Sequence, residues 1–194
     1  MLTENTFPKS IWGPCAWHLL HSISIGNNKE IKEKYKMSYF IFFKTFGYII
    51  PCIICSEHYK NLFGIFHKIN TDILSRQYLI KWVFDLHNIV NKNLKKNIYN
   101  LDDCISNNIN VNNKKIFFFI NNIFLHNDYK NISMYKYEQY YNFFVNFCKI
   151  YPDKNIKKIL KKLISSKDFK DIETPLEFEK WFINNYKKWT RLII

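Results

Sequence analysis

Residues 75–96 read SRQYLIKWVFDLHNIVNKNLKK, and this stretch decides the fold class. Its apolar side chains recur every three or four positions, which is the period of one face of an α-helix. The residues of this face are Trp82, Leu86, Ile89, Val90 and Leu94. Neither glycine nor proline interrupts the stretch. We therefore predict an amphipathic helix from about Ser75 to Lys96, with this face turned inward.

The same period appears in three earlier segments. They run from about Ile11 to Ile25, from Lys29 to Ile49 and from Cys52 to Lys68. The residues between them fit helix ends: Gly26-Asn27-Asn28 stops the first segment, Pro51 suits the first turn of the third, and Asn70-Thr71-Asp72 ends it. With four glycines and five prolines, the chain has too few turn signals for an all-β protein. We predict an all-α protein built on a compact four-helix bundle with a short fifth helix.

An Asn- and Lys-rich stretch from Ser106 to Lys115 marks a boundary. It predicts a first domain over residues 1–111 and a second, helical module over residues 112–194. In the second module Ile116 to Leu125 is one apolar run, and Thr174-Pro175 supplies the cap residue and first-turn proline of a last helix. This module either supports a dimer or docks a substrate.

The formal charge is +13, which would suit a nucleic acid or an acidic membrane. The lysines are scattered among asparagines rather than gathered in a basic block, so we favour biased composition and solvated helix faces, and do not expect nucleic-acid binding. No apolar signal region opens the chain, and no apolar run is long enough to span a membrane. We expect a soluble protein without a secretion signal or membrane contact.

Five cysteines occur, and two of them form a C-x-x-C pair at Cys52 and Cys55, directly after Pro51. A cysteine at a helix N-terminus is favoured as the reactive thiolate. From the residues alone, three interpretations stay open: a redox pair, a zinc site or two core cysteines. A structural zinc site needs four ligands, and apart from this pair the chain offers His58 and His67, with no second C-x-x-C.

His87 and Asn91 are four residues apart, so both lie on one face of the predicted helix. With Asn88 and the lysines Lys92, Lys95 and Lys96, this face could hold a nucleotide through amides and cations. A buried, hydrogen-bonded histidine in a polar seam is the alternative. Trp17 and His21 have the same spacing on the first predicted helix, where core packing would also explain them.

Three segments carry a set of motifs. They are Trp12-Gly13-Pro14-Cys15-Ala16-Trp17-His18-Leu19-Leu20-His21, Pro51-Cys52-Ile53-Ile54-Cys55-Ser56-Glu57-His58-Tyr59, and Trp82 followed by His87-Asn88-Ile89-Val90-Asn91-Lys92. Together they resemble the Erv/ALR family of FAD-linked sulfhydryl oxidases, in which W-G-x-x-x-W-x-x-L-H, P-C-x-x-C-x-x-H-[FY] and W-x-x-x-x-H-N-x-V-N follow in this order. Each motif is weak alone, whereas the set is specific. The resemblance covers about Trp12 to Cys104.

The resemblance implies a helical bundle that binds FAD non-covalently, and a dimer. It implies that a substrate thiolate attacks Cys52, that Cys55 lies next to the flavin, and that oxygen accepts the electrons and becomes hydrogen peroxide. Expected partners are thiol-bearing proteins or a thioredoxin-like oxidoreductase. No metal is expected. The expected cofactor-binding residues are Trp12, Gly13, Trp17, His21, His58, Tyr59, Trp82, His87, Asn88, Val90, Asn91, Lys92, Lys95, Lys96 and Tyr99.

The sequence lacks the second C-x-x-C of many family members. Cys15, Cys104 and Cys148 could therefore relay electrons only by pairing with one another or across a dimer. The Trp12-Gly13-Pro14 start and the composition are most similar to oxidases of large cytoplasmic DNA viruses, which implies a location in host cytoplasm or virion. The alternative function is a basic zinc- or nucleic-acid-binding virion protein without enzymatic activity.

Overall fold

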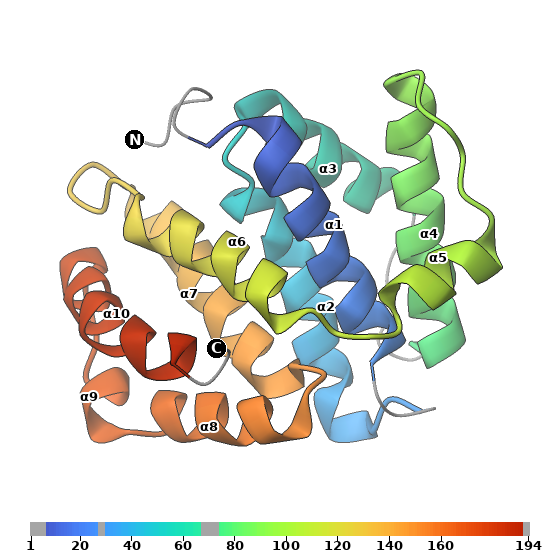
Figure 1. The fold of residues 1–194 in the computed structure, drawn as a ribbon. Coiled ribbons are helices and arrows are strands. Elements are labelled where there is room, and N and C mark those ends of the chain that lie inside the picture. Colours follow the sequence, from blue (N-terminus) through green and yellow to red (C-terminus); the bar gives the residue numbers. More distant parts are fainter. Residues whose placement is uncertain (1–6, 27–29, 67–73, 192–194) are drawn as a thin grey trace.

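The computed structural model describes residues 7–26, 30–66 and 74–191, and these form an all-α protein (Figure 1). Within these ranges there are ten helices and no strand. They are α1 (Lys9–Ile25), α2 (Glu33–Ile49), α3 (Ile53–Phe66), α4 (Arg76–Asn93), α5 (Leu101–Asn108), α6 (Asn113–Leu125), α7 (Met134–Ile150), α8 (Lys154–Ile164), α9 (Lys167–Lys170) and α10 (Pro175–Thr190). The predicted fold class is confirmed. None of the described helices is long and apolar enough to cross a membrane.

Local signals explain where the helices begin and end. Gly26 closes α1 with a φ of 55°, a left-handed conformation that favours glycine. Ser75 caps α4, since its hydroxyl accepts a hydrogen bond from the amide of Tyr78 at 3.1 Å. The predicted stops at Asn27-Asn28 and Asn70-Thr71-Asp72 lie outside the described residues.

Helix α4 ends at Asn93, three residues before the predicted end. Lys95 has a φ of 54°, so the chain reverses there instead of continuing the helix. Leu94 consequently lies outside the inward face and is 58% exposed, and its predicted burial is wrong. Trp82 and Leu86, predicted on the same face, are buried.

Arg76 ties three helices of the bundle together at the start of α4. Its buried guanidinium donates hydrogen bonds to the carbonyl oxygens of Ile23 and Ser24 at 2.9 and 2.7 Å, and to the hydroxyl of Tyr39 at 2.9 Å. These contacts satisfy carbonyl groups at the C-terminal end of α1. A Cβ atom on Gly26 would lie 2.9 Å from this guanidinium, so glycine is required there on two counts.

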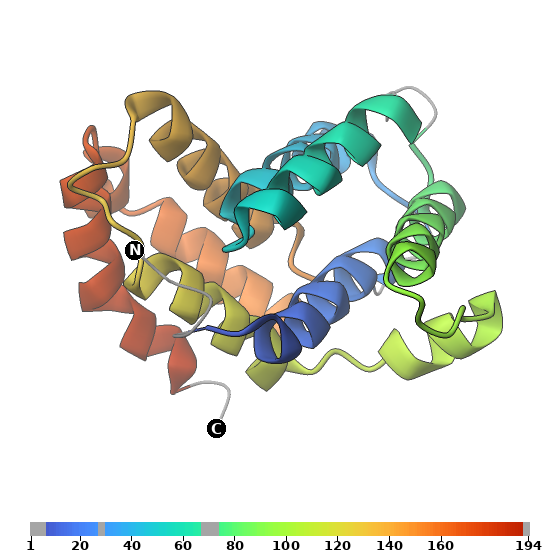
Figure 2. The same ribbon diagram turned by 90° about the horizontal axis from the view of Figure 1, so that it is seen from above.

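The second half of the chain packs directly against the first. The rings of Phe42 on α2 and Phe143 on α7 are stacked with centroids 5.0 Å apart, and Phe46 stacks on Phe119 of α6 at 6.2 Å. Helix α7 runs along α2, and α6 lies against α1 (Figures 1 and 2). Buried residues of both halves thus form one hydrophobic core. The predicted division into two modules between residues 111 and 112 therefore falls within one continuous core, and it stays a prediction about which residues carry which function.

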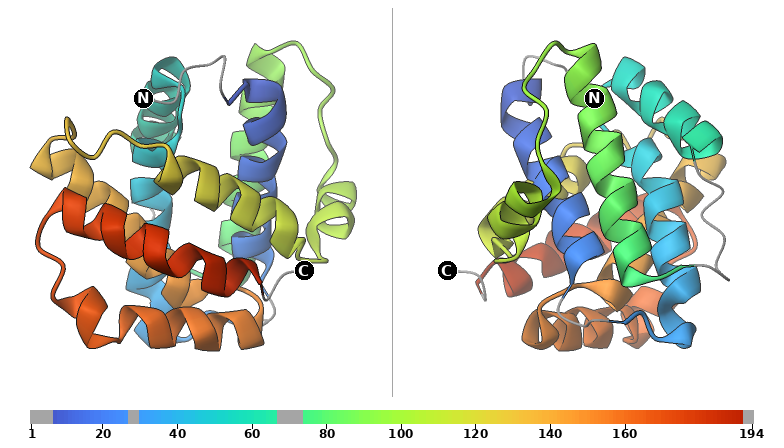
Figure 3. Two further views of the ribbon diagram at one scale, coloured as in Figure 1. Left: turned by 60° about the vertical axis from the view of Figure 1, so that its left-hand side comes forward. Right: turned by 90° about the vertical axis from the view of Figure 1, so that its right-hand side faces the viewer.

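Two further views show where the functional candidates lie. Helices α1 and α4 run side by side, and α5 lies against both of them (Figure 3). Helix α3 packs on α2, and its Tyr59 and Phe63 rings also meet Trp82 of α4. The three helices that carry the predicted motifs, α1, α3 and α4, therefore lie around the same part of the bundle.

Candidate functional site

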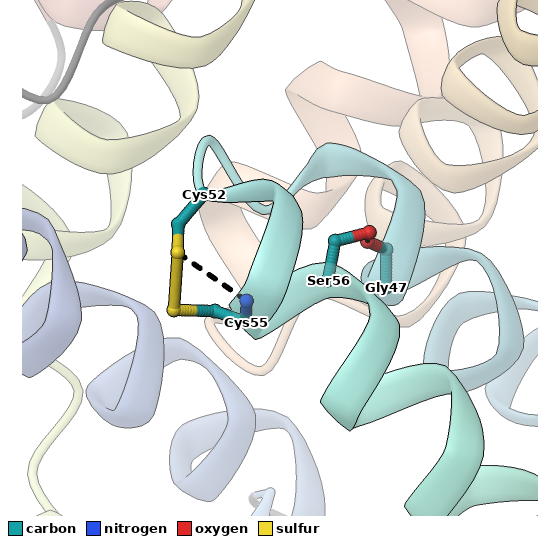
Figure 4. Close-up of a disulfide and its surroundings, with 4 residues drawn as sticks. All are labelled: Gly47, Cys52, Cys55 and Ser56. Carbon is teal, nitrogen blue, oxygen red and sulfur yellow. Dashed lines mark hydrogen bonds between the residues drawn. A yellow bond between two sulfur atoms is a disulfide. The ribbon is translucent and has the colours of Figure 1, made fainter.

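Cys52 and Cys55 form a disulfide at the beginning of α3 (Figure 4). Their Cα atoms are 5.2 Å apart, and the amide of Cys55 donates a hydrogen bond to Sγ of Cys52 at 3.3 Å. Cys52 precedes the helix and Cys55 lies in its first turn, so the pair lies at the end of the helix where backbone amides are free to donate. Of the three interpretations left open by the sequence, the redox pair is the one that predicts a disulfide at these positions, and its redox role stays a prediction.

The helix that carries the disulfide is anchored on α2. The hydroxyl of Ser56 donates to the carbonyl oxygen of Gly47 at 2.7 Å, on the side of α3 opposite the sulfurs (Figure 4). The hydroxyl of Tyr59 donates to the carbonyl oxygen of Phe43 at 2.8 Å. A Cβ atom on Gly47 would lie 2.7 Å from Cγ of Lys60, so the close approach of the two helices depends on this glycine.

The two cysteines differ in accessibility. Cys52 is only 3% exposed and packs in the hydrophobic core, whereas Cys55 is half-buried. The two residues between them, Ile53 and Ile54, are each 76% exposed. The resemblance implied an accessible Cys52, and in the structure Cys52 is the more covered of the two cysteines because it packs in the hydrophobic core.

A cluster of aromatic rings joins α1 to α4. Trp17 and His21 lie one helical turn apart on α1, and His87 faces them from α4. The rings of Trp17 and His87 are stacked with centroids 3.9 Å apart and planes 8° from parallel. Nε2 of His21 lies 2.9 Å from Nδ1 of His87. Tyr99 adds a fourth ring, 5.2 Å from that of His87. We call Trp17, His21, His87 and Tyr99 the ring cluster.

Asn88 holds the segment that brings Tyr99 to this cluster. Its side-chain amide donates to the carbonyl oxygen of Tyr99 at 3.0 Å, and its carbonyl oxygen accepts from the amide of Tyr99 at 3.0 Å. The turn before this segment is closed by a hydrogen bond from the amide of Lys96 to the carbonyl oxygen of Asn91 at 2.8 Å. Lys92, Lys95 and Lys96 are exposed around this turn.

Burial keeps both histidines of the cluster neutral. Desolvation, with repulsion from His87 and His18, lowers the pKa of His21 to about 3. Desolvation, with repulsion from Lys96, lowers the pKa of His87 to about 4. A neutral imidazole has one donor and one acceptor nitrogen. The site therefore presents neutral hydrogen-bonding rings, with the positive charge confined to the lysines at its rim.

Cys104 on α5 extends this chain of hydrogen bonds. Its Sγ lies 3.5 Å from Nδ1 of His21, and burial raises the pKa of its thiol. A neutral thiol that donates to Nδ1 leaves the proton of His21 on Nε2, which then donates to Nδ1 of His87. The proton of His87 would then be on Nε2. The sequence identified Cys104 only as a relay candidate, because nothing local shows that α5 returns to α1.

Two features of the site suit an added ligand. Asn91, which follows His87 by one helical turn, is 5% exposed, and its side-chain amide makes no hydrogen bond to any other residue that the structure describes. Gly13 precedes Trp17 by one turn on α1, and a Cβ atom there would meet nothing within 4 Å. Stacked rings, a side-chain amide that bonds no other described residue and open space beside a glycine suit a flat, polar ligand.

Among the described residues, no ring contact or hydrogen bond joins the remaining predicted cofactor residues to the ring cluster. Trp82 and Tyr59 are buried where α2, α3 and α4 meet, with ring centroids 6.4 Å apart. Trp12 is buried at the start of α1, and Val90 packs against the core. His58 lies near the end of α4, where its Nε2 is 3.4 Å from Nδ2 of Asn93. Trp12, Tyr59, Trp82 and Val90 pack in or against the core, whereas His58 makes only this polar contact. Contact of all five with a cofactor stays a prediction.

The other cysteines are free. Cys15, Cys104 and Cys148 are all buried and form no disulfide with one another. Among the described residues, no three His, Cys, Asp or Glu side chains gather in a group that could hold a metal ion. The structure thus lends no support to a relay by intramolecular pairing of these cysteines, or to the zinc-binding alternative.

Comparison with known proteins supports the resemblance. The profile of the Erv1 / Alr family matches residues 14–114. A probable FAD-linked sulfhydryl oxidase of Acanthamoeba polyphaga mimivirus is 31% identical over 80 residues, 41% of this chain and 56% of the relative. A mitochondrial FAD-linked sulfhydryl oxidase of Saccharomyces cerevisiae is 29% identical over 84 residues, 43% of each chain. An FAD-linked sulfhydryl oxidase of African swine fever virus is 33% identical over 89 residues, 45% of this chain and 71% of the relative.

The matched region spans about half the length of the mimivirus and yeast relatives. No solved structure matches the chain. The disulfide and the ring cluster lie inside the region that the family profile covers, and most of the second module lies outside it.

Proposed function

The chain belongs to the Erv1 / Alr family, and on that premise we propose that it is an FAD-linked sulfhydryl oxidase. The observation that carries the proposal is the Cys52–Cys55 disulfide at the start of α3, inside the region of the family match. Two substrate thiols are oxidised to a disulfide while Cys52 and Cys55 are reduced to thiols. The two electrons and two protons pass on to oxygen, which becomes hydrogen peroxide.

FAD fits the residues of the ring cluster and their neighbours. When bound, it accepts two electrons from a dithiol and passes them to oxygen. The ring cluster offers aromatic faces for a base, Asn91 offers a side-chain amide, and Gly13 leaves room. Lys92, Lys95 and Lys96 supply positive charge for the pyrophosphate. We place this cofactor site within residues 1–111, with Trp12, His58, Tyr59, Trp82 and Val90 as its remaining candidate residues.

The position of the disulfide suits thiol exchange. A substrate thiolate attacks Sγ of Cys52, a bond forms between these two sulfurs, and Cys55 leaves as a thiolate. The free amides in the first turn of α3 stabilise that negative charge. A second substrate thiol then displaces Cys52, which releases the substrate disulfide. Since Cys52 is covered in the structure, the first step needs the corner between α2 and α3 to open when a substrate binds.

The assembly and the partners rest on the family relationship. We propose a homodimer, because apolar side chains stay exposed around α5, among them Ile98, Leu101 and Ile109. Thiol-bearing proteins or a thioredoxin-like oxidoreductase would be the substrates. The names of the viral relatives are the support for a location in host cytoplasm or virion.

The visible spectrum of the purified protein tests the proposed function. A flavin absorbance band and oxygen consumption with a small dithiol are the expected results. FAD should be released into the supernatant when the protein is denatured, because the proposed contacts are non-covalent. A colourless protein that binds zinc, or binds DNA in a salt-sensitive manner, would instead indicate the basic virion protein.

A further inference from the structure

A groove of about 400 Å³ lies beside the corner between α2 and α3. Pro51 and Ile53, the two chain neighbours of Cys52, line it. One wall comes from α2 and α3, and the other from the end of α6, the following loop and α7. The second module therefore completes a groove that adjoins the chain on either side of Cys52, on the face of α3 that carries Ser56. Residues 1–111 alone would leave this groove open on one side.

Hydrogen-bonded and aromatic contacts hold the two walls together. The hydroxyl groups of Tyr48 on α2 and Tyr135 on α7 are 2.8 Å apart, and their rings meet edge-on at 5.9 Å. The ammonium of Lys60 lies 5.1 Å from the centroid of the Tyr48 ring. The ammonium of Lys136 lies 5.6 Å from that of Tyr140, which also lines the groove. The groove is thus formed before any ligand arrives.

Its charged lining is mainly positive. Lys60 and Lys136 contribute one ammonium from each wall, and Glu57 is the single carboxylate of the lining. The ion pairs among the described residues involve other lysines, namely Lys36 and Lys81, so neither groove ammonium is neutralised by a carboxylate. An occupant with negative side chains would complement these two charges.

Asn127 lines the same groove and carries an unsatisfied donor beneath the groove surface, which an occupant meets once the side chain turns outward. Its Nδ2 atom is buried and has no hydrogen-bond partner among the described residues. A buried donor without a partner destabilises the protein, and an acceptor that reaches it recovers that free energy. A backbone carbonyl or a carboxylate of an extended peptide would be such an acceptor, and the tyrosine rings offer apolar contact to the rest of a peptide.

We propose that this groove binds an acidic, cysteine-bearing segment of the polypeptide substrate and brings its thiol to the corner that covers Cys52. This inference rests on the proposed oxidase function and adds to it the substrate class and a role for the second module. Carboxylates of the segment meet Lys60 and Lys136, its backbone accepts from Asn127, and its contact with Pro51 and Ile53 accompanies the opening of the corner.

Steady-state kinetics on three substrates tests the proposal. Two synthetic peptides carry the same pair of cysteines, one flanked by Asp and Glu and the other by Lys, and dithiothreitol is the third substrate. The variant is Lys60→Glu with Lys136→Glu. The matched control is Lys158→Glu with Lys162→Glu, which changes the total charge equally at two exposed positions on α8.

The groove variant should raise KM for the acidic peptide by about tenfold and lower it for the basic peptide, since two attractions become repulsions. The turnover of dithiothreitol, which also shows that the variant is folded, should stay within about twofold of the unmodified protein, as expected for surface substitutions away from the reacting sulfurs. Asn127→Asp should raise KM for the acidic peptide in the same direction. Equal effects in the groove variant and the α8 control would overturn the proposal, as would an unchanged KM.

Binding separates this proposal from the oxidase function. The acidic peptide with both cysteines replaced by serine is inert in thiol exchange, and fluorescence anisotropy gives its Kd. Loss of binding in the groove variant supports the groove even if dithiothreitol is not oxidised, which would refute the proposed function alone. If the groove variant instead converts a dimer into monomers in sedimentation, the groove is an interface between two copies and the proposal fails.

Discussion

Nε2 of His21 on α1 lies 2.9 Å from Nδ1 of His87 on α4, and this contact joins two helices through two neutral rings. If either ring were protonated, both of its nitrogens would be donors, and the positive ring would be less stable beside its neighbour and the nearby lysine. Lys96 adds further positive potential at His87. The two histidines therefore make the stability of the packing between α1 and α4 depend on pH.

Acid should destabilise the protein through these histidines. Their pKa values fall from 6.5 in the unfolded chain to about 3 for His21 and about 4 for His87. Between pH 6.5 and these lower values, the unfolded chain binds more protons than the folded protein. The free energy of unfolding therefore decreases as the pH is lowered through this range. We expect a loss of about 1–2 kcal/mol for each histidine from about pH 6.5 to pH 5.

Urea unfolding at the two pH values measures this loss. The double variant His21→Gln with His87→Gln should show a much smaller difference between them. His126→Gln changes an exposed histidine away from the pair and is the control that should retain the dependence of the unmodified protein. If the double variant kept the full dependence, groups other than these histidines would be responsible.

A bulky side chain at Gly13 should displace the cofactor. Gly13→Phe fills the open space beside Trp17; overpacking of this kind costs about 1–3 kcal/mol, a rise of about 5- to 150-fold in Kd. A residue other than glycine before Pro14 has fewer backbone conformations. Gly13→Ala introduces this backbone restriction without the bulk of a phenyl ring, so it is the control for that effect. Gly64→Phe is a second control, since a Cβ atom at Gly64 on α3 also meets nothing within 4 Å. Flavin retained by Gly13→Phe at the level of both controls would place the cofactor elsewhere.

Removal of either sulfur of the pair should stop turnover. Cys52→Ser and Cys55→Ser should each abolish oxygen consumption with a dithiol while the protein stays yellow. Cys52→Ser leaves Cys55 as a thiolate, and we expect a long-wavelength charge-transfer band from its contact with flavin. Cys15→Ala, at a buried free cysteine, should remain active. A charge-transfer band in Cys55→Ser instead would reverse the two roles.

Stability of the bundle should depend on the second half of the chain. Phe143 on α7 is fully buried against Phe42 and Phe46 of α2. Phe143→Ala leaves a cavity there and should lower the free energy of unfolding by about 3–5 kcal/mol. Met134→Ala, at a half-exposed position of the same helix, should change it by less than about 0.5 kcal/mol. Denaturant unfolding followed by circular dichroism compares the two, and a similar small loss in both would show that α7 is dispensable.

Much of the secondary structure could be predicted because a helix is a local pattern. The apolar period placed α1 to α4 and α6, and the glycine at position 26 ends α1 as expected. The end of α4 was missed because Lys95 adopts a left-handed conformation that its residue type does not indicate. The burial of Cys52 was missed as well, since the motif specifies which residues are present and not which core they pack in.

By itself, the sequence determined the helical class, the C-x-x-C pair and the face of α4 that carries His87 and Asn91, because these depend on residues within a few turns of one another. The tertiary structure decided which of these faces meet. Cys104 reaches His21 across 83 positions, and Tyr135 reaches Tyr48 across 87. Contacts of this kind depend on how whole helices pack, a balance of burial and shape over the entire core, so no local pattern of residues specifies them.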